Sequence, residues 1–277
     1  ILRYKYRLGL NNYKEQTVDK LQNDLKQSRY YVLKQRLYNE AVTMLENKKG
    51  VLPLKKDANK RIAVVTFGKD NSVANKLKEN GIDNNAFLID VNASEEEIKR
   101  TAKQMKSYDY VILNIRSTSN YPAKNYGITE AMLNFVKKFP NSTKLIFNMF
   151  GSPYAVDKFS FGKSPNAVLI GYEDNEMVVN AIVDIMVGKQ SPKGKLPVSL
   201  KKYKYGKGLE YKGFLSPWTL PVSLLDNEYI RQIESVILDG IEKKAFPGCQ
   251  VIALKDGEII FDGNYGKYTY EGEQVVH

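Results

Sequence analysis

Glu173 and Asp174 are adjacent carboxylates that follow a predicted buried strand, Ala167 to Gly171. Two carboxyl groups held close together can work as a general acid and a general base. Helix capping is the other interpretation, because Asp174 stands where the next helix needs its N-cap and acids are stabilised at that helix end. We favour capping and assign no catalytic residue to this chain.

The sequence has one histidine, His277, and one cysteine, Cys249. A Ser-His-Asp triad needs a histidine beside the nucleophile, and His or Cys metal sites need several such ligands. A disulfide within the chain needs a second cysteine. We therefore expect no catalytic triad, no metal site and no cofactor.

Polar and aromatic residues follow the predicted strands, at the edge where parallel sheets bind ligands. The loop RSTSNYPAKNYG, from Arg116 to Gly127, suits a sugar or a neighbouring domain, and a solvated loop shaped by its proline and glycine is the alternative. The first loop, TFGKDNS, has one glycine where nucleotide-binding loops need more, which disfavours nucleotide binding. The residues that we place near a substrate are Arg116, Ser117, Ser119, Tyr154 and Glu173.

An alternation of strands and helices from Arg61 onward would position these residues. The predicted strands are apolar runs typical of central strands covered on both faces, namely RIAVVTFG, AFLIDV, YVILNI, LIFNMF and AVLIG. The predicted helices between and after them are Ser72 to Asn80, Ser94 to Met105, Thr129 to Lys138 and Asn175 to Val187. This order predicts an α/β fold, a three-layer sandwich with a mostly parallel sheet of five or six strands.

Further segments flank the predicted sandwich. Apolar residues spaced by three or four predict a helix from Thr17 to Glu46, and Pro53 makes the following VLPL an extended connector. After Leu200 a basic, glycine-rich stretch predicts an exposed strand or linker, followed by a helix from Asp226 to Lys244 and a hairpin. The expected boundaries are 1–54 for the helical segment and connector, 55–200 for the sandwich, 201–223 for the linker and 224–277 for the helix-hairpin fragment.

Composition limits the classes of partner. The 277 residues include 42 Lys and Arg against 31 Asp and Glu, a net charge of +11. Nucleic-acid binding is disfavoured because the lysines are scattered among tyrosines and glycines, as in residues 201–207, instead of following one helix. No run approaches the roughly 20 apolar residues of a membrane-spanning helix. The start at Ile1, without Met, leads us to expect a piece of a longer protein.

Five short motifs follow one another in a recognisable order. They are KYRLGL (Lys5–Leu10), TMLENKKGVLPL (Thr43–Leu54), FGSPYAV (Phe150–Val156), IGYEDNE (Ile170–Glu176) and GKLPVS (Gly194–Ser199). Together they resemble the C-terminal α/β sandwich domain of bacterial glycoside hydrolase family 3 enzymes, over about residues 1–200. KYRLGL would then end a preceding (β/α)8 barrel, and the long motif would lead into the second domain.

The resemblance implies that the catalytic groups lie elsewhere. In that family the nucleophile is an aspartate of the barrel, and the acid/base belongs either to the barrel or, in the β-glucosidase branch, to a glutamate of the second domain. FGSPYAV is closer to the branch whose acid/base lies in the barrel. Glu173 would be the candidate acid/base only if the protein belonged to the β-glucosidase branch. The implied function is a non-catalytic second domain, inactive alone, of a hydrolase whose barrel cleaves terminal β-linked N-acetylglucosamine or glucose with retention.

The end of the chain resembles a second family. A helix followed by FPGCQV, KDG and YG is similar to the beginning of a serine β-lactamase-like domain, over about residues 224–277. Such a domain would use a Ser-x-x-Lys motif further along the chain. The fusion implies a bacterial protein of the periplasm or cell envelope. The alternative function is a carbohydrate- or cell-wall-binding scaffold that links the barrel to the β-lactamase-like domain.

Overall fold

A computed structural model describes residues 1–13, 28–211, 228–255, 258–272, 274 and 276. They form two compact units. One comprises Lys34–Thr219 with Ile252–Phe261, and the other comprises Ile1–Leu33, Leu220–Val251 and Asp262–His277. Several predicted features lie outside the described residues, namely the Thr17 helix start, the last part of the predicted linker (212–223), the residues between the two hairpin strands (256–257) and His277.

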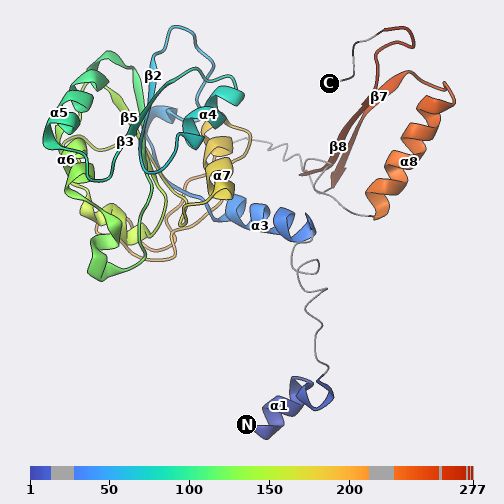
Figure 1. Cartoon of the computed structure of the whole chain (residues 1–277), viewed down its shortest axis with the longest axis horizontal. Helices are drawn as coiled ribbons and strands as arrows, with labels where there is room; N and C mark the ends of the chain where they lie inside the picture. Colours follow the sequence, from blue (N-terminus) through green and yellow to red (C-terminus); the bar gives the residue numbers. More distant parts are fainter. Residues whose placement is uncertain (14–27, 212–227, 256–257, 273, 275, 277) are drawn as a thin grey trace. The chain divides into compact units, whose positions relative to one another are not determined.

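The larger unit is built around a six-stranded sheet (Figure 1). Its spatial order is β1-β6-β5-β4-β2-β3, and every neighbouring pair is parallel except β1 with β6, which is antiparallel. The strands are β1 (Thr43–Asn47), β2 (Ile62–Phe67), β3 (Asn85–Ile89), β4 (Tyr110–Ile115), β5 (Lys144–Met149) and β6 (Ala167–Ile170).

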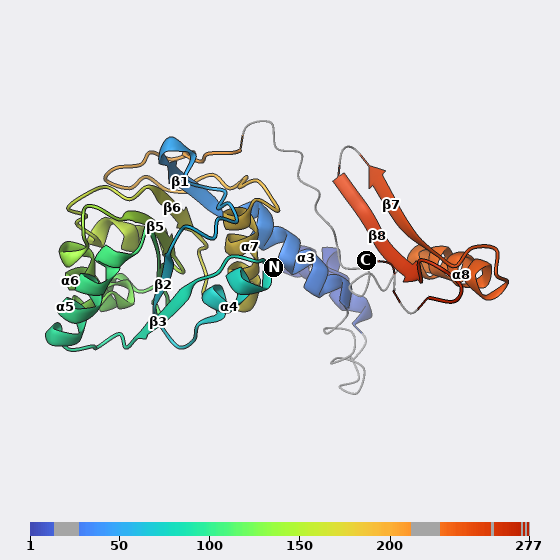
Figure 2. The same cartoon turned by 90° about the horizontal axis from the view of Figure 1, so that it is seen from above.

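Helices cover both faces of this sheet (Figures 1 and 2). One face carries α5 (Glu95–Gln104) and α6 (Glu130–Lys138), and the other carries α4 (Ser72–Glu79) and α7 (Glu176–Val187). This arrangement confirms the predicted three-layer α/β sandwich with a mostly parallel sheet.

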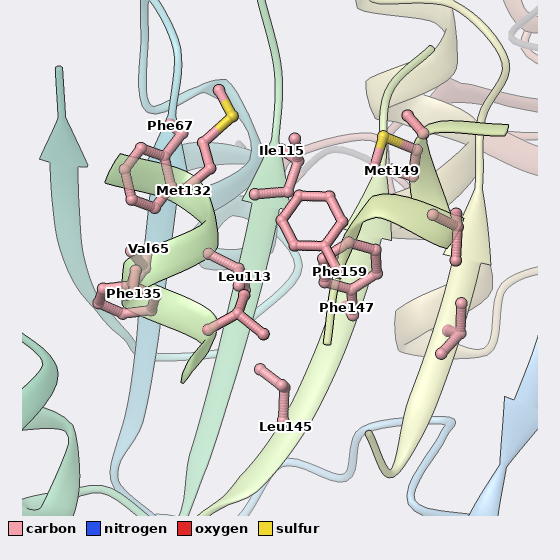
Figure 3. Packing of buried hydrophobic residues seen from close by; sticks show 14 of the residues in the cluster. Val65, Phe67, Leu113, Ile115, Met132, Phe135, Leu145, Phe147, Met149 and Phe159 are labelled. Carbon is pink, nitrogen blue, oxygen red and sulfur yellow. The ribbon is translucent and has the colours of Figure 1, made fainter. Parts of the chain in front are cut away.

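Each face of the sheet has its own apolar core, because successive strand residues point to opposite sides. On the α5/α6 side, Phe67 meets Phe135 edge-on at 5.6 Å between ring centroids, and Phe147 meets Phe159 at 5.1 Å (Figure 3). On the α4/α7 side, Val64 and its neighbours pack against the apolar face of α7. Two covered faces explain why the strands are continuous apolar runs rather than alternating ones.

Helix caps follow the sequence with one correction. The Ser94 Oγ accepts a hydrogen bond from the Glu97 amide at 3.2 Å, which confirms the predicted start of α5. At α7 the N-cap is Asn175, whose Oδ1 accepts from the Val178 amide at 3.0 Å. The prediction that Asp174 caps this helix is therefore wrong, because the Asp174 side chain turns to Arg116 instead.

The predicted helix from Thr17 to Glu46 is also wrong in its last part. The structure gives α3 (Ser28–Ala41), followed by the strand β1. Thr43 to Asn47 pair antiparallel with β6, and the Val42 carbonyl accepts from the Gly194 amide at 3.2 Å. Leu45 thus occupies a sheet core rather than a helix face, although its spacing from Ala41 fits a helix.

The segment after α7 runs back along this edge of the sheet. Leu196 is buried, the Leu209 amide donates to the Met44 carbonyl at 2.8 Å, and Tyr203 is 8% exposed. The stretch predicted to be an exposed strand or linker is mostly exposed as far as Tyr211. It is nevertheless anchored on the larger unit, where the Tyr211 hydroxyl donates to the Ile185 carbonyl at 2.8 Å.

The remaining elements are short. Helix α1 (Leu2–Arg7) ends before Gly9, whose φ of 73° suits a helix stop, and the 3-10 turn η1 (Leu10–Asn12) follows. Near the end of the chain, α8 (Glu228–Glu242) precedes the paired strands β7 (Gly248–Lys255) and β8 (Glu258–Gly266), which confirms the predicted helix and hairpin. The described helices include none that is long and apolar enough to span a membrane.

Candidate functional site

The predicted site residues gather at the carboxyl ends of the parallel strands. Arg116 directly follows β4, and its amide donates to the Phe67 carbonyl at 2.9 Å, which continues the ladder between β4 and β2. Its side chain starts at a central strand end, and the residue is only 7% exposed. A buried guanidinium must be paired, so its partners decide what this edge can do.

Two aspartates and a serine hold the Arg116 side chain. The guanidinium Nε donates to Asp174 Oδ1 at 2.6 Å, and Nη1 donates to Asp70 Oδ1 at 2.5 Å and to Ser72 Oγ at 2.6 Å. The guanidinium carbon lies 5.4 Å from the centroid of the Phe150 ring. We call Arg116, Asp70, Ser72 and Asp174 the Arg116 cluster.

The cluster changes the acidity of Asp70. Burial alone raises the pKa of this carboxyl, but hydrogen bonds from Ser72 and the adjacent Arg116 charge outweigh it and lower the pKa. The Ser72 amide also donates to Asp70 Oδ1 at 2.9 Å, at the start of α4. Asp70 and Asp174 therefore neutralise the charge of Arg116. Their bonds to it join the loops that follow β2, β4 and β6.

The backbone beside the cluster is tightly folded. Ser117 has a φ of 57°, and its amide donates to Asp174 Oδ2 at 2.9 Å. The Thr118 hydroxyl donates to the Phe150 carbonyl at 2.5 Å and lies directly over Gly151, which has a φ of 147°. A Cβ at residue 151 would lie 2.0 Å from the Thr118 Oγ1. At Ser117, the left-handed conformation is unusual for a residue with a Cβ, and it directs the Ser117 amide to Asp174.

Ser119 and Tyr154 occupy different environments. The Ser119 amide donates to the Tyr126 carbonyl at 2.9 Å, and its hydroxyl accepts from the Tyr121 amide at 3.2 Å, so it organises its own loop. Tyr154 is 44% exposed, and its ring stacks on Tyr126 with 6.2 Å between centroids and 25° between planes. Lys158 Nζ lies 5.7 Å from the Tyr126 ring centroid. This aromatic pair is suited to contact with the apolar face of a sugar ring.

The adjacent carboxylates Glu173 and Asp174 turn to different partners. Asp174 joins Arg116, whereas Glu173 accepts hydrogen bonds from the Tyr38 hydroxyl and from Asn175 Nδ2, the latter at 3.0 Å. Burial and the bond to Glu173 raise the pKa of Tyr38. The pair that could have formed an acid and a base is thus split, and Glu173 lies exposed at the edge beside α3.

The sequence did not point to three residues that hold this site. Asp70 and Ser72 come from the loop after the first predicted parallel strand. An acid at the same sheet edge as Arg116 could have indicated that Asp70 pairs with it. Tyr38 lies 135 positions before Glu173 and gives no local signal. Over the described ranges, no group of three or more His, Cys, Asp or Glu side chains is placed to hold a metal ion.

Comparison with known proteins identifies the larger unit. Residues 42–217 match the model of the glycosyl hydrolase family 3 C-terminal domain. No curated protein matches the sequence.

Solved structures of low identity are similar to this chain, and two β-glucosidase structures share its fold. A β-glucosidase from Listeria innocua with isofagomine has a TM-score of 0.53 and 15% identity, over 76% of this chain and 38% of that one. The same organism's β-glucosidase with gluconolactone has a TM-score of 0.52 and 17% identity, over 70% and 30%. A family 3 β-N-acetylglucosaminidase from Paenibacillus sp. str. FPU-7 has a TM-score of 0.47 and 17% identity, over 70% and 36%. This chain thus spans about a third of the length of these proteins.

Proposed function

Since the chain belongs to glycosyl hydrolase family 3 through its C-terminal domain, we propose that it serves as the non-catalytic second domain of such a glycosidase. The whole protein would hydrolyse terminal β-linked N-acetylglucosamine or glucose in a barrel domain that precedes this one. The larger unit would stand beside that barrel and help to shape its sugar site. The carbohydrate would therefore be reached through the barrel.

The pairing of the edge carboxylates is the observation that carries this proposal. Retaining glycosidases need two carboxyl groups about 5 Å apart, on either side of the bond that is cleaved. Here Asp70 and Asp174 are bound by Arg116, and Glu173 is bound by Tyr38 and Asn175. These carboxylates position loops and helices, which supports a structural role rather than a catalytic one.

An activity assay tests the proposal. The purified chain should show no turnover of nitrophenyl β-N-acetylglucosaminide or nitrophenyl β-glucoside above the buffer rate. Turnover that disappears in Glu173→Gln but persists in Glu176→Gln, a nearby exposed glutamate, would overturn it. Such a result would make Glu173 the acid/base of the β-glucosidase branch.

Carbohydrate binding by this domain itself is the second candidate function. The observation that favours it is the Tyr126–Tyr154 stack, which leaves one face of Tyr154 partly open at the same edge as the Arg116 cluster. With Arg116, Ser117 and Ser119 shaping the loop beneath, Tyr154 and Glu173 would be the groups nearest to a sugar. The domain would then act as a scaffold that holds a glycan or cell-wall polymer.

A titration separates the two candidate functions. If the domain binds sugar, N-acetylglucosamine oligomers should give a saturable response that weakens at least about fivefold in Tyr154→Ala, since an aromatic stacking contact contributes about 1 kcal/mol. Tyr205→Ala is the matched control, because Tyr205 is also exposed. The absence of any saturable response would leave only the non-catalytic structural role.

For the last part of the chain we infer a different module, the start of a serine β-lactamase-like domain at about residues 224–277. The order of a helix, α8, followed by the paired strands β7 and β8 supports this inference. Labelling of the whole protein with a fluorescent penicillin tests it. Labelling lost on substitution of the serine in a following Ser-x-x-Lys motif is expected, and no labelling would contradict it.

A bacterial periplasmic or cell-envelope location is proposed together with this fusion. Its support is the sequence resemblance of both ends to modules that act on glycans and cell-wall material. Fractionation of cells that make the whole protein tests the location. Recovery with the envelope or periplasmic fraction is expected, and recovery with a cytoplasmic marker would contradict it.

A further inference from the structure

A cavity of about 250 Å³ lies at the amino ends of the parallel strands, opposite the edge that carries the Arg116 cluster. Ile62, Tyr110 and Lys144 line it, and each is the first residue of its strand, in β2, β4 and β5. The 48–55 connector forms another wall. Five lysines line this cavity, namely Lys48, Lys49, Lys55, Lys60 and Lys144. We call it the lysine cavity.

The charge of the lysine cavity is unbalanced. Its lining contains five lysines and one carboxylate, Asp57, which gives a formal charge of +4 (five minus one). Asp57 Oδ1 accepts from the Asn59 amide at 2.9 Å in its own turn. Within the described ranges, none of the five lysines makes an ion pair with an acid within 4.0 Å. Like charges repel across such a space, so an anion that enters it would be attracted by all of them.

The walls of the cavity are fixed by hydrogen bonds. Asn47 bridges the connector, donating from Nδ2 to the Leu52 carbonyl at 2.9 Å and accepting from the Leu52 amide at 3.0 Å. The Leu54 amide donates to the Met186 carbonyl at 2.7 Å, and the Lys48 amide donates to the Asn166 carbonyl at 2.7 Å. A ligand would therefore enter a preformed space, which lowers the entropic cost of binding.

One lysine is also oriented by an aromatic ring. Lys144 Nζ donates to the Tyr110 hydroxyl at 3.2 Å and lies 4.8 Å from that ring's centroid. An ammonium group has three donors, so two are left for a ligand. At the other wall, Lys49 and Gly50 have φ values of 55° and 60°, which bend the chain around the cavity.

We propose that the lysine cavity binds a compact ligand that carries two or more phosphate groups. Several closely spaced negative charges match the +4 lining, and lysines bind phosphate as point charges without the forked geometry that arginine offers to a carboxylate. The volume fits a diphosphate or a short phosphodiester segment better than a bulky organic ligand, whose pockets usually exceed about 300 Å³. The phosphates could come from a free oligophosphate or from a phosphodiester polymer.

Calorimetric titration of the full chain tests the proposal and distinguishes the two sources. The probes are pyrophosphate, tripolyphosphate and poly(glycerol phosphate). We expect saturable binding of at least one of them. Binding of the polymer alone would identify a phosphodiester ligand, and binding of the small anions would identify a free oligophosphate. No saturable binding of any probe would overturn the proposal.

Charge-matched variants place the binding in the cavity. Lys48→Gln/Lys144→Gln should weaken it at least about tenfold, since each charged hydrogen bond contributes more than a neutral one. Lys78→Gln/Lys137→Gln removes the same charge from exposed lysines outside the lining and should change it less than about twofold. Lys48→Arg/Lys144→Arg should retain binding. Equal weakening by both Gln pairs would show general surface attraction and overturn the site.

Discussion

At the carboxyl edge of the sheet, the buried Arg116 pairs with two carboxylates, those of Asp70 and Asp174. At the amino edge, five lysines line a cavity that contains a single carboxylate, that of Asp57. Arg116 makes its ion pairs at 2.5 and 2.6 Å. The lysines of the cavity make none with an acid within 4.0 Å in the part of the chain that the structure describes. Lys48 is attracted by Glu46, a carboxylate outside the lining of the cavity, and contributes to the lowered pKa of that carboxyl. The same sheet thus carries closely paired charge at one edge and mostly unpaired lysines at the other.

The difference follows from burial. A charge removed from water must be paired within the protein, whereas a solvated charge is stabilised by water and needs no partner. Arg116 is therefore fully used by the fold, and its removal should damage the fold. Four of the five lysines are exposed and Lys48 is half-buried, so their removal should affect a ligand and leave the fold intact. Four measurements test this contrast.

The largest effect is expected for Arg116→Met. Asp70 and Asp174 would lose their shared partner, and the loops after β2, β4 and β6 would no longer be joined. The free energy of unfolding should fall by about 2–4 kcal/mol, measured by urea denaturation. Arg100→Met, at an exposed position on α5, should change it by less than about 0.5 kcal/mol. A similar loss of stability in both variants would mean that Arg116 contributes no more to the free energy of unfolding than an exposed arginine does.

Gly151→Ala should come next. Its φ of 147° is strained for any residue with a Cβ, and the new atom would meet the Thr118 hydroxyl. We expect a loss of about 2–3 kcal/mol in the free energy of unfolding. Gly162→Ala, where nothing lies within 4 Å of the added Cβ, is the control. Equal stability of the two variants would show that the Thr118 contact is easily relaxed.

A smaller, pH-dependent effect is expected for Asp70→Asn. The folded-state pKa of Asp70 is lowered below its usual 3.8, so the charged form contributes stability that is present above that value and lost as pH falls through the folded pKa. Half of this side chain is exposed, so the cost at pH 7 should be about 1 kcal/mol or less. Urea denaturation at pH 7 and at a series of pH values below 3.8 should show the cost shrinking as pH falls. An unchanged cost would exclude the charge as its source, and Asp83→Asn, at an exposed position, serves as the control.

The smallest effect on stability is expected for Lys48→Gln/Lys144→Gln. Relief of repulsion between lysines should offset the lost contact of Lys144 with Tyr110, so the free energy of unfolding should stay within about 0.5 kcal/mol of the wild type. The same urea measurement checks it. A loss as large as that of Arg116→Met would remove the contrast between the two edges.

The parallel strands could be predicted because each is an apolar run that is recognisable from its own residues. YVILNI predicts β4 at Tyr110–Ile115, since an unbroken apolar run fits a strand covered on both faces. β1 could not be predicted in this way. Its pairing with Ala167 to Ile170 lies more than 100 positions away, while the local spacing of Ala41 and Leu45 fits a helix.

The two edges show the same limit for site residues. Arg116 could be placed at a strand end from its position alone, but the split of Glu173 from Asp174 depends on Tyr38, which comes from α3. The lysines appear scattered along the chain because residues 48–60 and Lys144 meet only after the strands align. A pattern within a segment predicts its element, whereas convergence between segments requires the fold.

The pairing of β1 with β6 has a consequence for synthesis on the ribosome. β1 is synthesised before its hydrogen-bonding partner β6, which begins at Ala167. Until then the strand that contains Met44 and Leu45 is an unprotected apolar edge, open to wrong pairing with other chains. The nascent chain therefore carries a risk of aggregation at β1 that lasts until β6 has emerged and paired with it.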